Sequence, residues 1–74
     1  MKNRIVLDPA VMVGKPVIMG TRITVEMILR QLSQGISIDE LLDNYPHLTR
    51  EDVYAAMAYA SERMEEDRIY PVKV

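Results

Sequence analysis

The stretch ISIDELLDNYPHLTREDV, residues 36–53, decides the fold because it contains two helix starts and the break between them. Ser37 and Glu40 form an S-x-x-E capping box, in which each side chain accepts a hydrogen bond from the backbone N–H of the other residue. Pro46 disfavours helical backbone at the residue before it, so this helix should end near Asn44. We therefore predict a short helix of about seven residues before the proline.

The second helix start in this stretch is Thr49, which is followed three residues later by Asp52 in place of the usual Glu. This pair predicts a second capping box and a helix that continues to about Glu66. At 100° per residue, one side of that helix is apolar and is expected to face the core. The expected inward residues are Val53, Ala56, Met57, Ala60 and Met64.

A further helix precedes residue 36. Thr24 can cap a helix over residues 25–34, with Glu26 in its positively polarised first turn. Gly35 follows at the position where a left-handed residue commonly ends a helix. One face of this helix is aliphatic and is expected to be buried: Val25, Ile28, Leu29 and Leu32.

The chain begins with an arm that precedes all three helices. Residues 5–7 and 16–19 are short runs with β-branched side chains, separated by turn residues, and predict two strands. Pro16 restricts the second strand to an edge or makes it a strand start. The sequence therefore predicts an all-α fold of one domain, residues 1–74. It would comprise a β-containing arm (1–23), a trihelical helix-turn-helix bundle (24–66) and a tail (67–74).

Composition excludes several classes of protein. The 74 residues contain no cysteine, so neither a disulfide framework nor a thiolate metal site can supplement a small core. No apolar run approaches the roughly 20 residues of a membrane span, and the N-terminus lacks the apolar region of a secretory signal. We expect a cytoplasmic protein that gains stability from oligomerisation.

The sequence contains few residues that could form the active site of an enzyme. His47 is the single histidine, and no Ser-His-Asp or Cys-His set exists. Carboxylates gather late in the third helix at Glu62, Glu65, Glu66 and Asp67. They could hold magnesium only if they converged on one point, and a solvated helix end is the simpler interpretation. We therefore predict no catalytic, cofactor-binding or metal-binding residues, with a magnesium-dependent enzyme as the weakest alternative.

Charge is unevenly distributed along the chain. Residues 1–34 hold five basic and two acidic residues, a net of +3, whereas residues 35–74 hold four basic and nine acidic residues, a net of −5. The start of the third helix would read base edges in a helix-turn-helix protein, but it carries Glu51 and Asp52. If DNA is bound, the basic arm is the better candidate. Its candidate DNA-contacting residues are Lys2, Arg4, Lys15 and Arg22.

The outer face of the third helix combines small residues with tyrosine. Such a face permits close approach by another chain, and tyrosine is enriched in interfaces. A scattered apolar surface is the plainer explanation. With the late carboxylates included, the candidate partner-binding residues are Tyr54, Ala55, Ala58, Tyr59, Glu62, Glu65 and Glu66.

Three ordered motifs carry a resemblance to a known family: G-K-P-V-I-x-G-T-R-I, Y-P-x-L-T and A-x-x-Y-A. Over about residues 4–61 the chain resembles the domain-of-unknown-function 433 family. The resemblance implies a trihelical, homeodomain-like fold with a β-containing arm, and a homodimer. It also implies a role as the antitoxin partner of a PIN-like ribonuclease toxin.

These observations lead to two hypotheses. The first is a non-enzymatic, homodimeric antitoxin-like protein that binds and inhibits a PIN-like nuclease, with its acidic helix end in a groove of that nuclease. The alternative is a DNA-binding regulator, for example of its own operon, that uses the arm and the helix-turn-helix. Arg22 either pairs with a carboxylate of the third helix or contacts phosphate, and we expect the ion pair.

Overall fold

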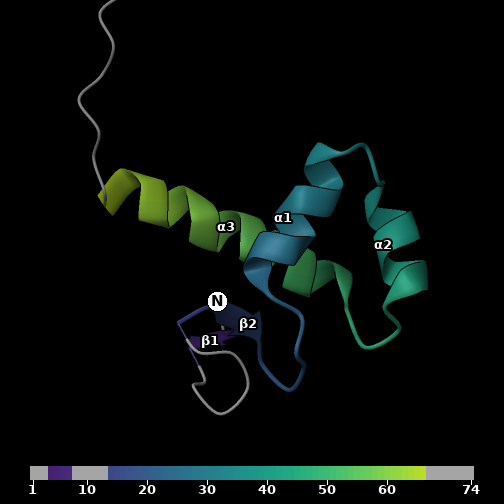
Figure 1. Ribbon diagram of the computed structural model, residues 1–74, viewed down its shortest axis with the longest axis horizontal. Helices are drawn as coiled ribbons and strands as arrows, with labels where there is room; N and C mark the ends of the chain where they lie inside the picture. The colour runs from purple at the N-terminus through teal and green to yellow at the C-terminus, as the bar shows by residue number, and fades with distance from the viewer. Residues whose placement is uncertain (1–3, 8–13, 67–74) are drawn as a thin grey trace, which may run out of the picture.

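The fold consists of three helices and one small antiparallel sheet. The computed structural model describes residues 4–7 and 14–66. In chain order these residues form two strands and three helices (Figure 1), namely β1 (Ile5–Leu7), β2 (Pro16–Ile18), α1 (Val25–Ser33), α2 (Ile38–Asn44) and α3 (Arg50–Glu66). The predicted helices and strands are therefore confirmed. Lys2 and the predicted tail, 67–74, lie outside the described residues.

Each helix begins at the residue that its sequence predicts. The Thr24 hydroxyl accepts a hydrogen bond from the backbone N–H of Met27 at 3.0 Å and caps α1. Ser37 and Glu40 form the reciprocal capping box of α2, with two backbone hydrogen bonds of 3.1 Å. Local chemistry alone thus determines where α1 and α2 begin.

The α3 capping box is also confirmed, with Asp52 in the place of the usual Glu. The Thr49 backbone N–H donates to the Asp52 carboxylate at 3.0 Å, and the Asp52 N–H donates to the Thr49 hydroxyl at 3.1 Å. Asp52 is buried, unlike most aspartates. The cap therefore lies at the edge of the core, and its carboxylate has a second partner that is described below.

α1 ends in a Schellman motif. Gly35 has a φ of +95°, which a residue with a side chain adopts only at a cost. The N–H groups of Gly35 and Ile36 donate to the carbonyls of Leu32 and Gln31, each at 3.1 Å. α1 ends at Ser33, one residue earlier than predicted, because these bonds begin the turn.

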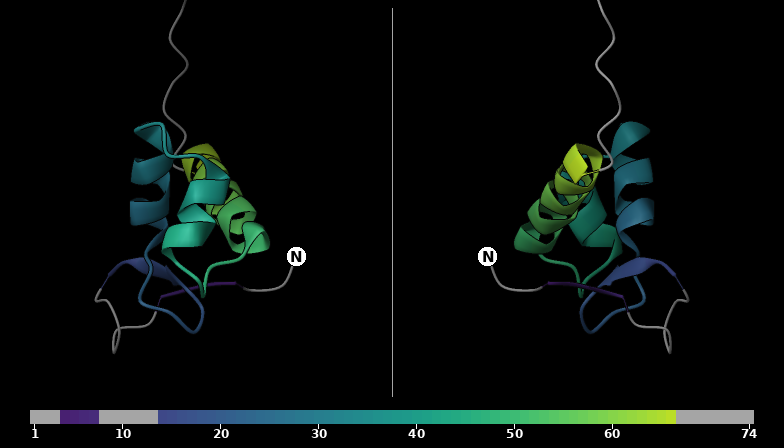
Figure 2. Two further views of the ribbon diagram at one scale, coloured as in Figure 1. Left: turned by 90° about the vertical axis from the view of Figure 1, so that its right-hand side faces the viewer. Right: turned by 90° about the vertical axis from the view of Figure 1, so that its left-hand side faces the viewer.

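The two strands form a hairpin beneath the helices (Figure 2). They pair antiparallel in the register Ile5–Ile18, Val6–Val17 and Leu7–Pro16. Pro16 is the first residue of β2. This position suits proline, because proline has no backbone N–H to donate to a neighbouring strand. The other side of β2 is occupied too, because the Ile18 N–H donates to the Ile23 carbonyl at 2.9 Å. The unpaired edge of the sheet, within the described residues, is the outer side of β1.

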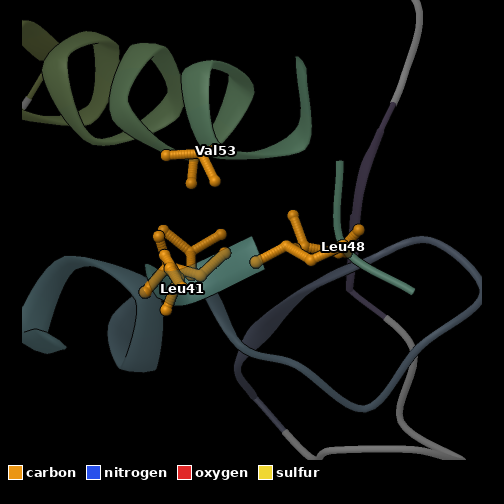
Figure 3. Close-up of a cluster of buried hydrophobic side chains, with 7 residues drawn as sticks. Leu41, Leu48 and Val53 are labelled. Atoms are coloured by element: carbon orange, nitrogen blue, oxygen red, sulfur yellow. The ribbon is translucent and has the colours of Figure 1, made fainter. Parts of the chain in front are cut away.

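A single cluster of aliphatic side chains joins the elements, and Leu41, Leu48 and Val53 converge in it (Figure 3). Leu41 and Val53 have no exposed surface, although α2 and α3 contribute them from different sides. The hairpin reaches the same cluster through Ile18 and, less deeply, Ile5. The core therefore includes the arm, which is part of the packed fold.

The predicted inward face of α3 is partly wrong. Val53 and Ala56 are buried as expected, but Met57 and Met64 are exposed. Ala55, which we expected on the outer face, is buried instead. The cause is the hairpin, because β1 also contacts α3 and Arg4, the residue before β1, pairs with Asp52. Its contact rotates the buried side of α3 toward Asp52 and Ala55, and moves the two methionines into solvent.

Candidate protein-interaction surface

Three large side chains on the outer face of α3 are exposed, namely Tyr54, Met57 and Met64, with 49%, 42% and 71% of their surface accessible. Spacings of three and seven residues place them on one side of a helix. We call these three residues the outer stripe. Tyr54 was predicted to lie here, whereas the two methionines were predicted to be core residues. A continuous apolar stripe on a surface helix is a common feature of interaction sites.

Acidic residues lie along one flank of the outer stripe. At 100° per residue, Glu51, Glu62 and Glu65 follow the same side of α3, next to Tyr54. All three are exposed. Glu66 is the last residue of the helix. The outer face of α3 therefore combines an apolar centre with a negative edge.

The remaining predicted partner-binding residues are less accessible. Ala55 is buried, so its prediction as a contact residue is wrong. Ala58 is half-buried and lies on the acidic flank of the stripe. Tyr59 is half-buried and packs against the core cluster, so it contributes to the fold.

Two of the predicted DNA-contacting residues are engaged by carboxylates. Arg4 donates to Asp52 at 3.0 Å, and this carboxylate is the buried member of the α3 cap. Lys15 donates to Glu26 at 2.9 Å, and Arg30 donates to the same carboxylate at 2.6 Å. The hydrogen bond from Lys15, followed by the charges of Lys15 and Arg30, lowers the pKa of Glu26. Phosphate would have to compete with these pairs for Arg4 and Lys15.

Arg22 does not form the predicted ion pair with α3. Its side chain is exposed and has no hydrogen-bond or ion-pair partner among the residues that the structure describes. Arg4 makes that contact instead, because β1 is the part of the arm that contacts α3. Arg22 lies in the turn after β2, beside the loop between α2 and α3.

The first turn of α3 does not present free donors. Arg50 pairs with Asp39 of α2, and hydrogen bonds with Tyr54 and Asp39 raise the pKa of Arg50. Asp52 is buried in the cap, and Glu51 is exposed. A base edge or phosphate placed here would meet an occupied guanidinium and a carboxylate.

The described residues were also searched for groups that could bind a metal ion and for helices that could cross a membrane. Within residues 4–7 and 14–66, no three carboxylate or imidazole groups gather closely enough to ligate one ion. In the same residues, no helix combines the length and apolar character that a membrane crossing requires.

Residues 5–60 match the family described as "Protein of unknown function (DUF433)". The chain belongs to the DUF433 family. The match includes all three motifs that carried the resemblance, and it confirms that resemblance. None of the curated proteins matches this DUF433 chain.

A solved structure supports the same family. The chain is similar to the crystal structure of a DUF433 member protein from Anabaena variabilis ATCC 29413, with 40% sequence identity and a TM-score of 0.79. The similarity covers 88% of this chain and 64% of that chain, so this chain spans less than two thirds of its relative. The three-helix arrangement with its small hairpin is therefore shared by a second DUF433 protein.

Proposed function

We propose that this DUF433 protein is a non-enzymatic, antitoxin-like subunit that binds and inhibits a PIN-like ribonuclease toxin. The observation that carries the proposal is the outer stripe of α3, which leaves Tyr54, Met57 and Met64 in solvent. A domain this small has few apolar side chains to spare from its core. The exposure of three large apolar side chains on the same side of one helix is explained if a partner protein covers them.

The composition of the outer stripe suits a protein partner. Tyrosine is over-represented among the residues that dominate binding energy. Methionine is unbranched and polarizable, so it adapts its shape to a partner surface. The stripe also resembles the apolar side of a helix that lies in a groove, where contacts recur every three or four residues.

The acidic flank suggests what the partner surface carries. A ribonuclease must attract RNA phosphates, so its substrate groove is expected to be basic. Glu51, Glu62 and Glu65 would complement such a groove, while the outer stripe packs against its apolar wall. We propose that the inhibitor acts by occupying this groove. Charge complementarity would speed the association, and burial of the stripe would slow dissociation.

The proposed homodimer would use another surface. Two outer stripes brought face to face would also bring two acidic flanks together, which opposes self-association through α3. The outer edge of β1 is the alternative, because its backbone has no partner among the described residues. Antiparallel pairing of two β1 strands would satisfy both edges and leave α3 available for the toxin.

DNA binding is the alternative function, and a homeodomain-like helix-turn-helix formed by α2 and α3 would be its basis. One observation favours it: Arg22 is exposed and has no carboxylate partner among the described residues. The ion pairs of Arg4 and Lys15, and the acidic start of α3, weigh against it. We therefore place nuclease inhibition first.

The substitution Met57→Lys tests the proposed function. It places a charge in the middle of the outer stripe and should cost at least about 2 kcal/mol of binding, roughly 30-fold in Kd. The measurement is capture of the co-expressed nuclease by the tagged chain from its native operon, together with inhibition of RNA cleavage by the purified pair. Because Met57 is exposed, the melting temperature of the variant should remain close to that of the wild type.

Met19→Lys is the matched control. Met19 is an exposed methionine at the end of β2, outside α3, so the same charge there should leave capture and inhibition unchanged. Normal capture and inhibition by Met57→Lys would contradict the proposed use of the outer stripe. Recovery of the chain without any nuclease would contradict the antitoxin role itself.

A further inference from the structure

A cleft of about 580 Å³ lies between the turn after β2 and the loop that joins α2 to α3. Its base is formed by Val6 and Val17, which are paired across the hairpin. One wall is the segment Gly20–Ile23, and the other is Tyr45–His47. These walls come from the G-T-R-I and Y-P-x-L-T motifs, which are distant in sequence. The fold therefore brings two of the three family motifs together around one hollow.

The first wall is held by its own hydrogen bonds. The Thr21 N–H and hydroxyl both donate to the Ile18 carbonyl, at 3.0 and 2.8 Å. Gly20 has a φ of +81°, which suits the third position of a type II turn. The Ile23 N–H donates to the Thr21 hydroxyl at 3.0 Å, while the Ile23 carbonyl accepts from Ile18. Arg22 therefore lies between Thr21 and Ile23, whose hydrogen bonds fix the backbone on both sides of it.

The second wall is equally constrained. The Leu48 N–H donates to the Tyr45 carbonyl at 2.8 Å and closes a turn around Pro46 and His47. Leu48 is buried in the core, and the Tyr45 hydroxyl accepts a hydrogen bond from the Gln31 amide at 3.0 Å. Both walls are therefore set by the fold without a ligand, as in most small-molecule sites.

Charge and size indicate what the cleft would accept. Arg4, Lys15, Arg30 and Arg50 each pair with a carboxylate, whereas Arg22 has no such partner among the described residues. Among the residues that the structure describes, no carboxylate lines the cleft, and the cleft volume lies within the range of small-molecule sites. A guanidinium offers paired donors that match a planar or tetrahedral oxyanion. Val6, Ile23 and Tyr45 provide apolar surface beside it, whereas Val17 is almost wholly buried.

We propose that this cleft binds a small organic anion, in which Arg22 holds a carboxylate or phosphate and the side chains of Val6 and Ile23 contact an aromatic or aliphatic body. His47 lies at the same opening and adds a second polar contact. The proposal does not depend on nuclease inhibition, because none of the outer-stripe residues lines the cleft.

Amide chemical shifts of the intact chain test the proposal. Phenyl phosphate and 4-ethylbenzoate supply the two head groups on an aromatic body, and benzyl alcohol is the neutral match. Either anion should shift the amides of Gly20, Thr21 and His47 saturably, with a Kd of about 1 mM or tighter. The head group that binds more tightly identifies the class of ligand. Benzyl alcohol should leave these amides nearly unmoved.

Two variants separate the site from general attraction of anions. Arg22→Gln removes the charge and should weaken binding about tenfold or more, because charge-assisted hydrogen bonds are lost. Lys15→Gln removes an exposed charge of the same arm outside the cleft and should change nothing.

Four results would overturn the proposal. The first is the absence of saturable shifts with either anion, and the second is equal response to benzyl alcohol. The third is unchanged binding by Arg22→Gln. A single-stranded oligonucleotide that shifts these amides when neither small anion does would also overturn it, and would assign Arg22 to nucleic acid instead.

Discussion

Replacing Leu41 with alanine should lower the free energy of unfolding by about 3 kcal/mol, within the range of about 2–5 kcal/mol measured for buried Leu→Ala changes. Leu41 has no exposed surface and packs between residues of α1 and α3, such as Ile28 and Val53. Alanine would leave a cavity that the surrounding helices cannot fill. Total stability for a 74-residue domain is of the order of 4–11 kcal/mol, so the loss is a large fraction of it.

Urea unfolding followed by circular dichroism measures this loss, and Leu42→Ala is the matched control. Leu42 is the next residue of α2 and is only half-buried, so its truncation should cost about 1 kcal/mol. If both variants lost the same stability, the orientation of α2 described here would be wrong.

Replacing Asp52 with alanine should be the next most damaging change, at roughly 2–3 kcal/mol. One carboxylate oxygen accepts the Thr49 N–H and closes the α3 cap, while the other accepts from the Arg4 guanidinium. The substitution therefore removes one half of the α3 capping box and the ion pair between Arg4 and α3, while the Thr49 hydroxyl still accepts the backbone N–H of residue 52. The free energy of unfolding from urea titration should fall, and the hairpin amides should exchange with solvent faster than those of α1.

Asp39→Ala and Asp52→Asn are the control variants for this measurement. Asp39 also pairs with an arginine, Arg50, but is exposed, so its removal should cost less than about 1 kcal/mol. Asparagine at residue 52 keeps an acceptor for the cap but loses the charge, and should fall between wild type and alanine. Equal stability of Asp39→Ala and Asp52→Ala would contradict the role assigned to the buried carboxylate.

The helix boundaries could be predicted from the sequence because local chemistry sets them. Ser37 with Glu40, and Thr49 with Asp52, satisfy backbone donors within four residues of themselves. Gly35 ends α1 through a backbone conformation that needs no distant partner. Each signal lies wholly within one short segment, so no knowledge of the tertiary contacts was required.

The buried side of α3 could not be predicted in this way. Periodicity placed Met57 in the core because it shares an apolar side of the helix with Val53, and placed Ala55 outside because it points away from that side. The side of a helix that is buried depends on what packs there, and the arm contacts α3 at Asp52, through the ion pair with Arg4. The signal available in the sequence was an aspartate in the capping box, since a cap carboxylate can also bind an arginine of the arm.

The candidate sites also combine features that the sequence predicts with features that depend on tertiary contacts. Tyr54 was predicted as a surface aromatic, but the two methionines that complete the outer stripe were missed with the orientation of α3. Arg22 was predicted to pair with a carboxylate of the third helix, and this expected partner was wrong. The cleft beside it joins Gly20–Ile23 to Tyr45–His47, and only the folded chain places these segments together.

Methionine oxidation in the free chain and in its complex with the nuclease tests the central claim most directly. Met19, Met57 and Met64 are all exposed, so dilute peroxide should convert each to the sulfoxide in the free chain, as peptide mass spectrometry reports. We expect the complex to protect Met57 and Met64 several-fold and to leave Met19 reactive. Protection of Met19 alone, or unchanged rates at Met57 and Met64, would show that the partner binds elsewhere.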